Sequence, residues 1–135
     1  MGTMKVLHFY FAIAFSLAVL ARLIWMFTGT EHARWRNFIP TTKKRWNEAI
    51  GTFMFYTFVR RSPPECPGHN PMAGATYVAV FSLYLVMIAT GLGLYAVDTA
   101  VGSIMSSFTL LLTPFGGPQG ARWVHHVVMW LLIGF

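Results

Sequence analysis

Apolar residues gather in three runs along the chain, separated by two connectors of different composition. Residues 73–97 contain no charged side chain, and residues 6–27 are apolar except for four side chains, which are His8, Tyr10, Ser16 and Arg22. A helix of about 20 apolar residues crosses the hydrocarbon core of a bilayer, and both runs reach that length. The pattern therefore predicts two transmembrane helices.

The third apolar run begins near Trp123 and continues to Phe135, the last residue. It is too short to cross the hydrocarbon core by itself. We expect residues 123–135 to be a transmembrane helix that is cut off part-way, and the chain to be a fragment rather than a reduced version of a longer protein.

The first connector, residues 28–70, is polar and should lie outside the membrane core. Within it, residues 46–59 are largely apolar and aromatic but too few to span, and basic residues flank them on both sides. This composition is typical of an interfacial helix, with aromatic rings at headgroup level and cations near lipid phosphates. Asn70 before Pro71 resembles a helix N-cap followed by proline at the first helical position.

The second connector, residues 98–121, carries almost no charge and is punctuated by proline and glycine. Its middle, residues 104–112, is mostly apolar and should lie against the membrane surface or a partner protein. Just before it, the sequence Thr-Gly-Leu-Gly at 90–93 is small enough to allow close contact between helices. A loosened helix end is the alternative interpretation of those glycines.

Composition supports an all-α membrane protein. The chain is 56% hydrophobic and 10% charged, against roughly 25% charged residues in an ordinary soluble domain. The formal net charge of +6 fits anionic lipid headgroups better than nucleic acid, because the basic residues concentrate in one connector between apolar runs. One cysteine, Cys66, excludes an internal disulfide, and no Cys-x-x-Cys-His motif is present for covalent haem attachment.

Charge also predicts orientation. Seven of the ten Lys and Arg residues lie in the first connector, namely Arg34, Arg36, Lys43, Lys44, Arg45, Arg60 and Arg61. The positive-inside rule then places residues 28–70 in the cytoplasm. The starts of the first and third apolar runs would face the opposite side of the membrane.

Two histidines should consequently lie at similar depth, close to that opposite side. His8 comes three residues into the first apolar run, and His125 lies about as deep in the third. Two imidazoles from different helices are the axial ligands that a low-spin b-type haem needs, and the small residues Ala12 and Ser16 on the face of His8 would leave room for the ring. Histidines that only hydrogen-bond backbone groups are the alternative. A non-haem metal site of His125, His126 and Met129 is a further one, although adjacent residues project about 100° apart on a helix.

Five segments together resemble the b-type cytochrome subunit of membrane-bound nickel-iron uptake hydrogenases. They are Val6-Leu7-His8-Phe9, Leu20-Ala21-Arg22-Leu23-Ile24-Trp25, Gly68-His69-Asn70-Pro71-Met72-Ala73, Thr90-Gly91-Leu92-Gly93-Leu94-Tyr95, and His125 ahead of Met129-Trp130. The resemblance covers nearly the whole chain in the same order, and Gly-His-Asn-Pro is its most specific part.

The resemblance implies a four-helix membrane cytochrome, related to the formate dehydrogenase gamma subunit, that anchors a periplasmic hydrogenase of small and large subunits. Such a protein passes electrons from an iron-sulfur cluster of the small subunit through haem b to a quinone. By position, His8 and His125 match the ligands of the haem nearer the periplasm. Arg22 and His69 are candidates for a haem-propionate or quinone environment, although snorkelling and helix capping explain them equally well.

The chain also departs from this pattern. The family's first helix, with its own ligand histidine, is absent before Met1, and the later histidine of the last helix would fall beyond Phe135. These residues support one haem, and a second is expected only in the full-length subunit. Two other functions stay open: a structural anchor without a redox role, and the equivalent subunit of another oxidoreductase such as formate dehydrogenase.

Overall fold

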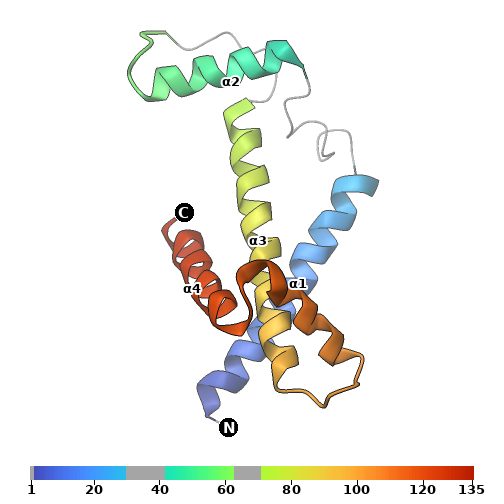
Figure 1. Ribbon diagram of the computed structural model, residues 1–135. Coiled ribbons are helices and arrows are strands. Elements are labelled where there is room, and N and C mark those ends of the chain that lie inside the picture. Colours follow the sequence, from blue (N-terminus) through green and yellow to red (C-terminus); the bar gives the residue numbers. More distant parts are fainter. Residues whose placement is uncertain (1, 30–41, 63–70) are drawn as a thin grey trace. The chain divides into compact units, whose positions relative to one another are not determined.

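The computed structural model describes residues 2–29, 42–62 and 71–135, and every regular element in those ranges is helical. In chain order the elements are α1 (Thr3–Thr28), α2 (Lys43–Tyr56), α3 (Pro71–Val97), the 3₁₀ helix η3 (Met105–Phe115) and α4 (Pro118–Gly134) (Figure 1). The chain forms two compact units, residues 1–79 and 80–135.

Two helices, Thr3–Thr28 and Met72–Val97, are long and apolar enough to cross a membrane. The first begins three residues before the predicted run, directly after Gly2. It ends at Gly29, whose backbone N–H donates to the carbonyl of Trp25. Helix α3 starts at Pro71, the predicted first helical position, where a missing N–H costs no hydrogen bond.

Helix α2 is shifted toward the N-terminus relative to the predicted residues 46–59. It has 14 residues and ends at Tyr56 because Phe58 adopts a left-handed conformation with φ of 61°. The N–H of Val59 then donates to the carbonyl of Met54, a Schellman-type end that satisfies carbonyls of the last turn. At 14 residues the helix is too short to span a bilayer.

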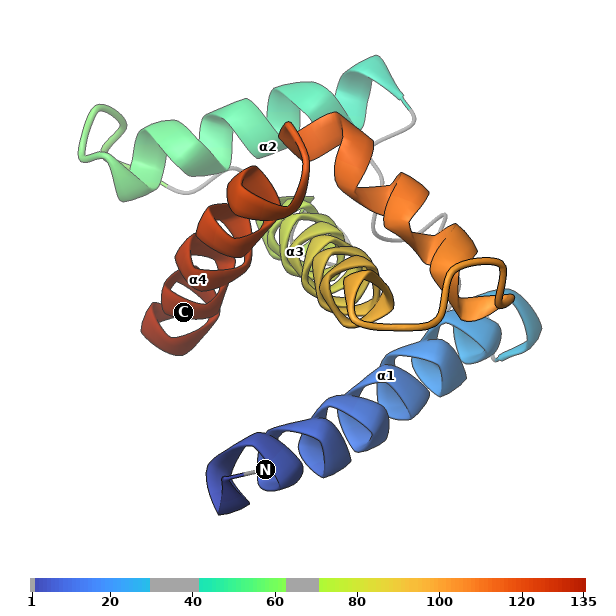
Figure 2. The same cartoon turned by 60° about the horizontal axis from the view of Figure 1, so that its bottom comes forward.

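Within residues 80–135 the chain turns back after α3, and η3 crosses near the C-terminal end of that helix (Figures 1 and 2). The contact depends on Gly93: a Cβ placed there would overlap the Leu112 side chain and lie 3.3 Å from the carbonyl oxygen of Phe108. Leu112 is buried. The predicted close contact through the glycines at 90–93 is therefore confirmed, and α3 continues regularly to Val97 rather than loosening.

The turn from η3 into α4 uses two glycines with positive φ. Gly116 has φ of 76° and Gly117 has φ of 87°, a conformation that costs other residues energy. The N–H of Gly116 caps η3 by donating to carbonyls of its last turn. Pro118 follows at the start of α4, so this helix begins five residues before the predicted Trp123.

We predict that Gly93→Ala destabilises the packing of η3 on α3. Overpacking a tight contact costs about 1–3 kcal/mol, which outweighs the gain of about 1 kcal/mol in helix propensity. Gly134→Ala is the matched control, because no atom lies within 4 Å of a Cβ at that helical position. The unfolding midpoint in mixed detergent micelles should fall for Gly93→Ala only; an equal or higher midpoint would contradict the close packing.

Candidate functional site

His125 lies on the buried face of α4. Its neighbours one helical turn away on that face are Ala121 and Val128, the two buried residues of the helix, whereas Trp123 and Trp130 are exposed. The imidazole itself is half-buried. An ionisable side chain at this position of an apolar helix needs a polar partner or a function.

That partner is Thr90 of α3. The Nδ1 atom of His125 lies 2.8 Å from the hydroxyl oxygen of Thr90, and Thr90 is fully buried. The same hydroxyl lies 2.7 Å from the carbonyl oxygen of Val86 and 3.1 Å from that of Met87. The hydrogen bond thus ties one ring nitrogen of His125 to a buried side chain on a neighbouring helix.

Gly91 lets the imidazole approach α3. A Cβ at this position would lie 3.3 Å from Cε1 of His125, tighter than an ordinary van der Waals contact. The residue next to Thr90 therefore limits how closely the ring and the helix can meet, and a larger side chain would push the imidazole away. Thr90 and Gly91 together determine where the imidazole of His125 packs against α3.

His126 has different surroundings from its neighbour. It is exposed, and its Nδ1 donates to the carbonyl of Arg122 one turn earlier on the same helix, at 2.7 Å. The two imidazole planes are inclined by 77° with centroids 6.4 Å apart. The geometry agrees with the expectation that adjacent histidines project in different directions, and it separates His126 from any site built on His125.

His8 lies on α1, in the other unit, and is exposed. One and two turns further on are Ala12 and Ser16, and the Ser16 hydroxyl donates to the carbonyl of Ala12 at 2.7 Å. This internal bond satisfies the hydroxyl within the helix, so the face beyond His8 presents small side chains. Because His8 and His125 belong to separate units, their pairing stays a prediction from the sequence.

The two remaining candidates differ in what the structure describes. Arg22 is exposed on α1, two turns before its end, where a long side chain can extend toward headgroups. His69 lies outside the described residues, as do His32, Cys66 and Asn70. The assignment of Arg22 and His69 to a haem-propionate or quinone environment therefore stays a prediction from the sequence.

Within the described ranges, no group of three or more His, Cys, Asp or Glu side chains is arranged to hold a metal ion. The alternative site of His125, His126 and Met129 gains no support from the separate partners of the two histidines. A haem site with two imidazole ligands is not such a group, because it takes only one histidine from each of two helices.

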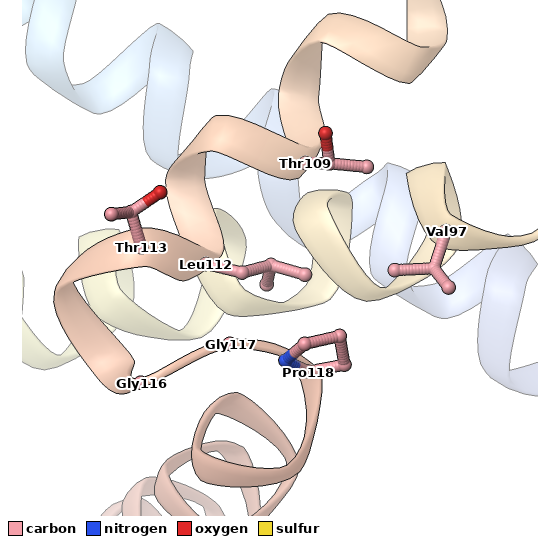
Figure 3. A pocket seen from close by; sticks show the side chains of 7 residues that line it. All are labelled: Val97, Thr109, Leu112, Thr113, Gly116, Gly117 and Pro118. Atoms are coloured by element: carbon pink, nitrogen blue, oxygen red, sulfur yellow. The ribbon is translucent and has the colours of Figure 1, made fainter. Parts of the chain in front are cut away.

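An open depression of about 560 Å³ lies where η3 turns into α4 (Figure 3). The side chain of Leu112 extends from η3 toward the end of α3 across it. Its lining consists of Val97, Thr109, Leu112, Thr113, Gly116, Gly117 and Pro118. It offers no imidazole, thiol or carboxylate, and the hydroxyl of Thr109 already donates to the carbonyl of Ser106, so the depression is not a ligation site.

Sequence reasoning missed Thr90. The sequence shows it only as one of several small residues, whereas in the structure its hydroxyl lies 2.8 Å from Nδ1 of His125 on α4. A threonine inside an otherwise apolar helix, adjacent to a glycine, is the signal that could have identified it. Its partner could not have been chosen without knowing which helix packs on α3.

Comparison with known proteins matches the whole chain, residues 1–135, to a family model described as prokaryotic cytochrome b561. Similar proteins include subunits named probable Ni/Fe-hydrogenase B-type cytochrome subunit. The chain is 32% identical to that of Rhodobacter capsulatus and 30% identical to that of Bradyrhizobium diazoefficiens. It is 28% identical to the probable Ni/Fe-hydrogenase 1 B-type cytochrome subunit of Escherichia coli K12.

Each of these alignments covers all of this chain but only 53%, 56% and 59% of the respective relative. The chain thus spans little more than half the length of the curated relatives it matches. No solved structure matches the chain.

Proposed function

Since the chain belongs to the prokaryotic cytochrome b561 family, we propose that it is the haem-binding, electron-transferring part of the membrane subunit of a nickel-iron hydrogenase. The observation that carries the proposal is the match over every residue, with relatives named as B-type cytochrome subunits of such hydrogenases. The chain itself would catalyse no reaction. It would accept electrons from a catalytic partner and pass them on.

His8 and His125 are the proposed axial ligands of one haem b. A bound haem would supply an iron centre that accepts and releases one electron at a time. His8 is the sixth residue of α1 and His125 the eighth residue of α4, a difference of about 3 Å in rise along the two helices. This similar depth supports the pairing. Two donors of the same type suit a low-spin haem, whose iron changes geometry little between its two oxidation states.

The residues around both histidines fit a flat, apolar ring. On α1, Ala12 and the internally bonded Ser16 leave a smooth face, and on α4 the flanking residues Ala121 and Val128 are small or apolar. Such surroundings would suit the apolar macrocycle of a haem held by these two imidazoles. A second haem would require further ligand histidines besides His8 and His125.

Partners and orientation follow from the same proposal. The hydrogenase small and large subunits would dock on the periplasmic side, next to the starts of α1 and α4, and the basic residues 28–70 would lie in the cytoplasm against anionic lipid. A membrane quinone would take two electrons, delivered singly, and two protons. Arg22, near the cytoplasmic end of α1, is a candidate for the quinone or propionate environment, and so is His69.

We predict that His125→Ala and His8→Ala each remove one haem b per copy of the full-length subunit. Hydrogen-dependent quinone reduction should fall at least 100-fold, whereas reduction of a soluble dye by the hydrogenase subunits should persist. His126→Ala is the matched control: its exposed ring donates to the carbonyl of Arg122 on its own helix, so haem content should stay unchanged. The measurement is a reduced-minus-oxidised visible spectrum of the purified complex, with haem quantified per chain.

Two results would overturn the proposal. Full haem content in His125→Ala would exclude that ligand, and quinone reduction that survives both substitutions would favour a purely structural anchor. Co-purification of a formate dehydrogenase in place of a hydrogenase would keep the electron-transfer role but reassign the partner.

The orientation is tested by cysteine labelling in a Cys66→Ser background. Ser62, which follows α2, and Ser107, in the first turn of η3, are both exposed. Ser62→Cys and Ser107→Cys therefore report on the first and the second connector, respectively. In intact spheroplasts a membrane-impermeant maleimide should label Ser107→Cys, and Ser62→Cys should react only after lysis. Labelling of both from outside would contradict the proposed topology.

A further inference from the structure

We propose that Thr90 is the positioning residue that fixes the tautomer and orientation of His125, so that Nε2 is the nitrogen directed to haem iron. This inference rests on the proposed function, because it assumes that His125 is a haem ligand. It concerns only residues 80–135, where α3 and α4 are joined by a hydrogen bond and a glycine contact.

The direction of the hydrogen bond follows from counting protons. A threonine hydroxyl has one proton to donate. Two of the three neighbours of the Thr90 hydroxyl are carbonyl oxygens, of Val86 at 2.7 Å and of Met87 at 3.1 Å, which can only accept. If the hydroxyl donated to the ring instead, its oxygen would face both carbonyls with lone pairs alone. The hydroxyl therefore donates within α3 and accepts a hydrogen bond from Nδ1–H of His125, with 2.8 Å between Nδ1 and the hydroxyl oxygen.

A neutral imidazole with its proton on Nδ1 carries its lone pair on Nε2. Metal-ligating histidines commonly donate the other ring N–H to an oxygen atom, which fixes the tautomer, orients the ring and raises its basicity as a ligand. Thr90 is placed to do this from a different helix. Because its own proton is committed to a backbone carbonyl, the hydroxyl cannot easily reverse the bond and favour the other tautomer.

Gly91 restricts the ring from a second side. A Cβ there would lie 3.3 Å from Cε1 of His125, the carbon between the two ring nitrogens. The imidazole therefore packs with its Nδ1–Cε1 edge against α3, which limits rotation about the side-chain bonds. A hydrogen bond and a steric boundary together specify one ring orientation, as a ligand that must meet iron at fixed geometry requires.

The test compares Thr90→Val with Thr90→Ser in the full-length subunit within its complex. Valine keeps the shape and removes the acceptor, whereas serine keeps the hydroxyl. Thr76→Val is the matched control, because the Thr76 hydroxyl on the same helix donates to the carbonyl of Met72 four residues earlier, as the Thr90 hydroxyl does to that of Val86. Within the described part of the chain, no histidine is hydrogen-bonded to Thr76.

For Thr90→Val we expect haem affinity to fall about 10- to 100-fold, the usual cost of removing such a supporting hydrogen bond. We also expect the midpoint potential of the haem to rise, because a less basic imidazole stabilises ferric iron less. Each tenfold loss in the preference for the ferric state raises the potential by about 59 mV. Thr90→Ser should keep the haem affinity and the midpoint potential at their wild-type values, and so should Thr76→Val.

The potential distinguishes positioning from mere packing. A Thr90→Val complex that binds haem with wild-type affinity and potential would overturn the role of Thr90 while leaving haem ligation intact. A shift of equal size in Thr90→Ser or Thr76→Val would also overturn it, because the acceptor at residue 90 would then not be the cause. Failure of the proposed function has a different signature: wild-type protein without haem, or His125→Ala with full haem content.

Discussion

A polar side chain in an apolar helix must satisfy its hydrogen bonds nearby, because hydrocarbon offers none. The hydroxyls of Ser16, Thr76 and Thr90 all meet this constraint by donating to a carbonyl one turn earlier on their own helix. The Thr90 hydroxyl, having donated, still has acceptor capacity, and in this structure that capacity is used across helices by His125. The hydrogen bond joins α3 to the face of α4 on which the buried residues Ala121 and Val128 also lie.

Small residues make that meeting possible. The imidazole of His125 packs against Gly91, and the side chain of Leu112 packs against Gly93. The two glycines are about half a helical turn apart on α3, and they contact α4 and η3, respectively. The paired positive φ values of Gly116 and Gly117 then reverse the chain between the two contacts. A family of membrane cytochromes built on helices needs such close approach, because packing between helices in lipid depends on shape rather than on exclusion of water.

Much of this could be predicted from the sequence, and the limits have physical causes. The family resemblance drawn from Val6–Phe9, Gly68–Ala73 and the other segments is confirmed by the match over residues 1–135. The all-helical membrane character is confirmed as well. Helix ends were displaced where local backbone chemistry decided them, as at the left-handed Phe58 and the proline start of α4 at Pro118. The partner of His125 was not predictable, because periodicity gives the face on which a residue lies but not the helix that covers it. The pairing of His8 with His125 stays a prediction.

The central claim is that His125 ligates haem iron through Nε2, opposite a second histidine. Near-infrared magnetic circular dichroism of the oxidised, full-length subunit in its complex tests this most directly, because the energy of the ferric charge-transfer band identifies the pair of axial ligands. The account predicts a low-spin band at the energy typical of two neutral imidazoles, lost from one haem when His125 is replaced. A band typical of any other ligand pair, or an identical spectrum without His125, would contradict it.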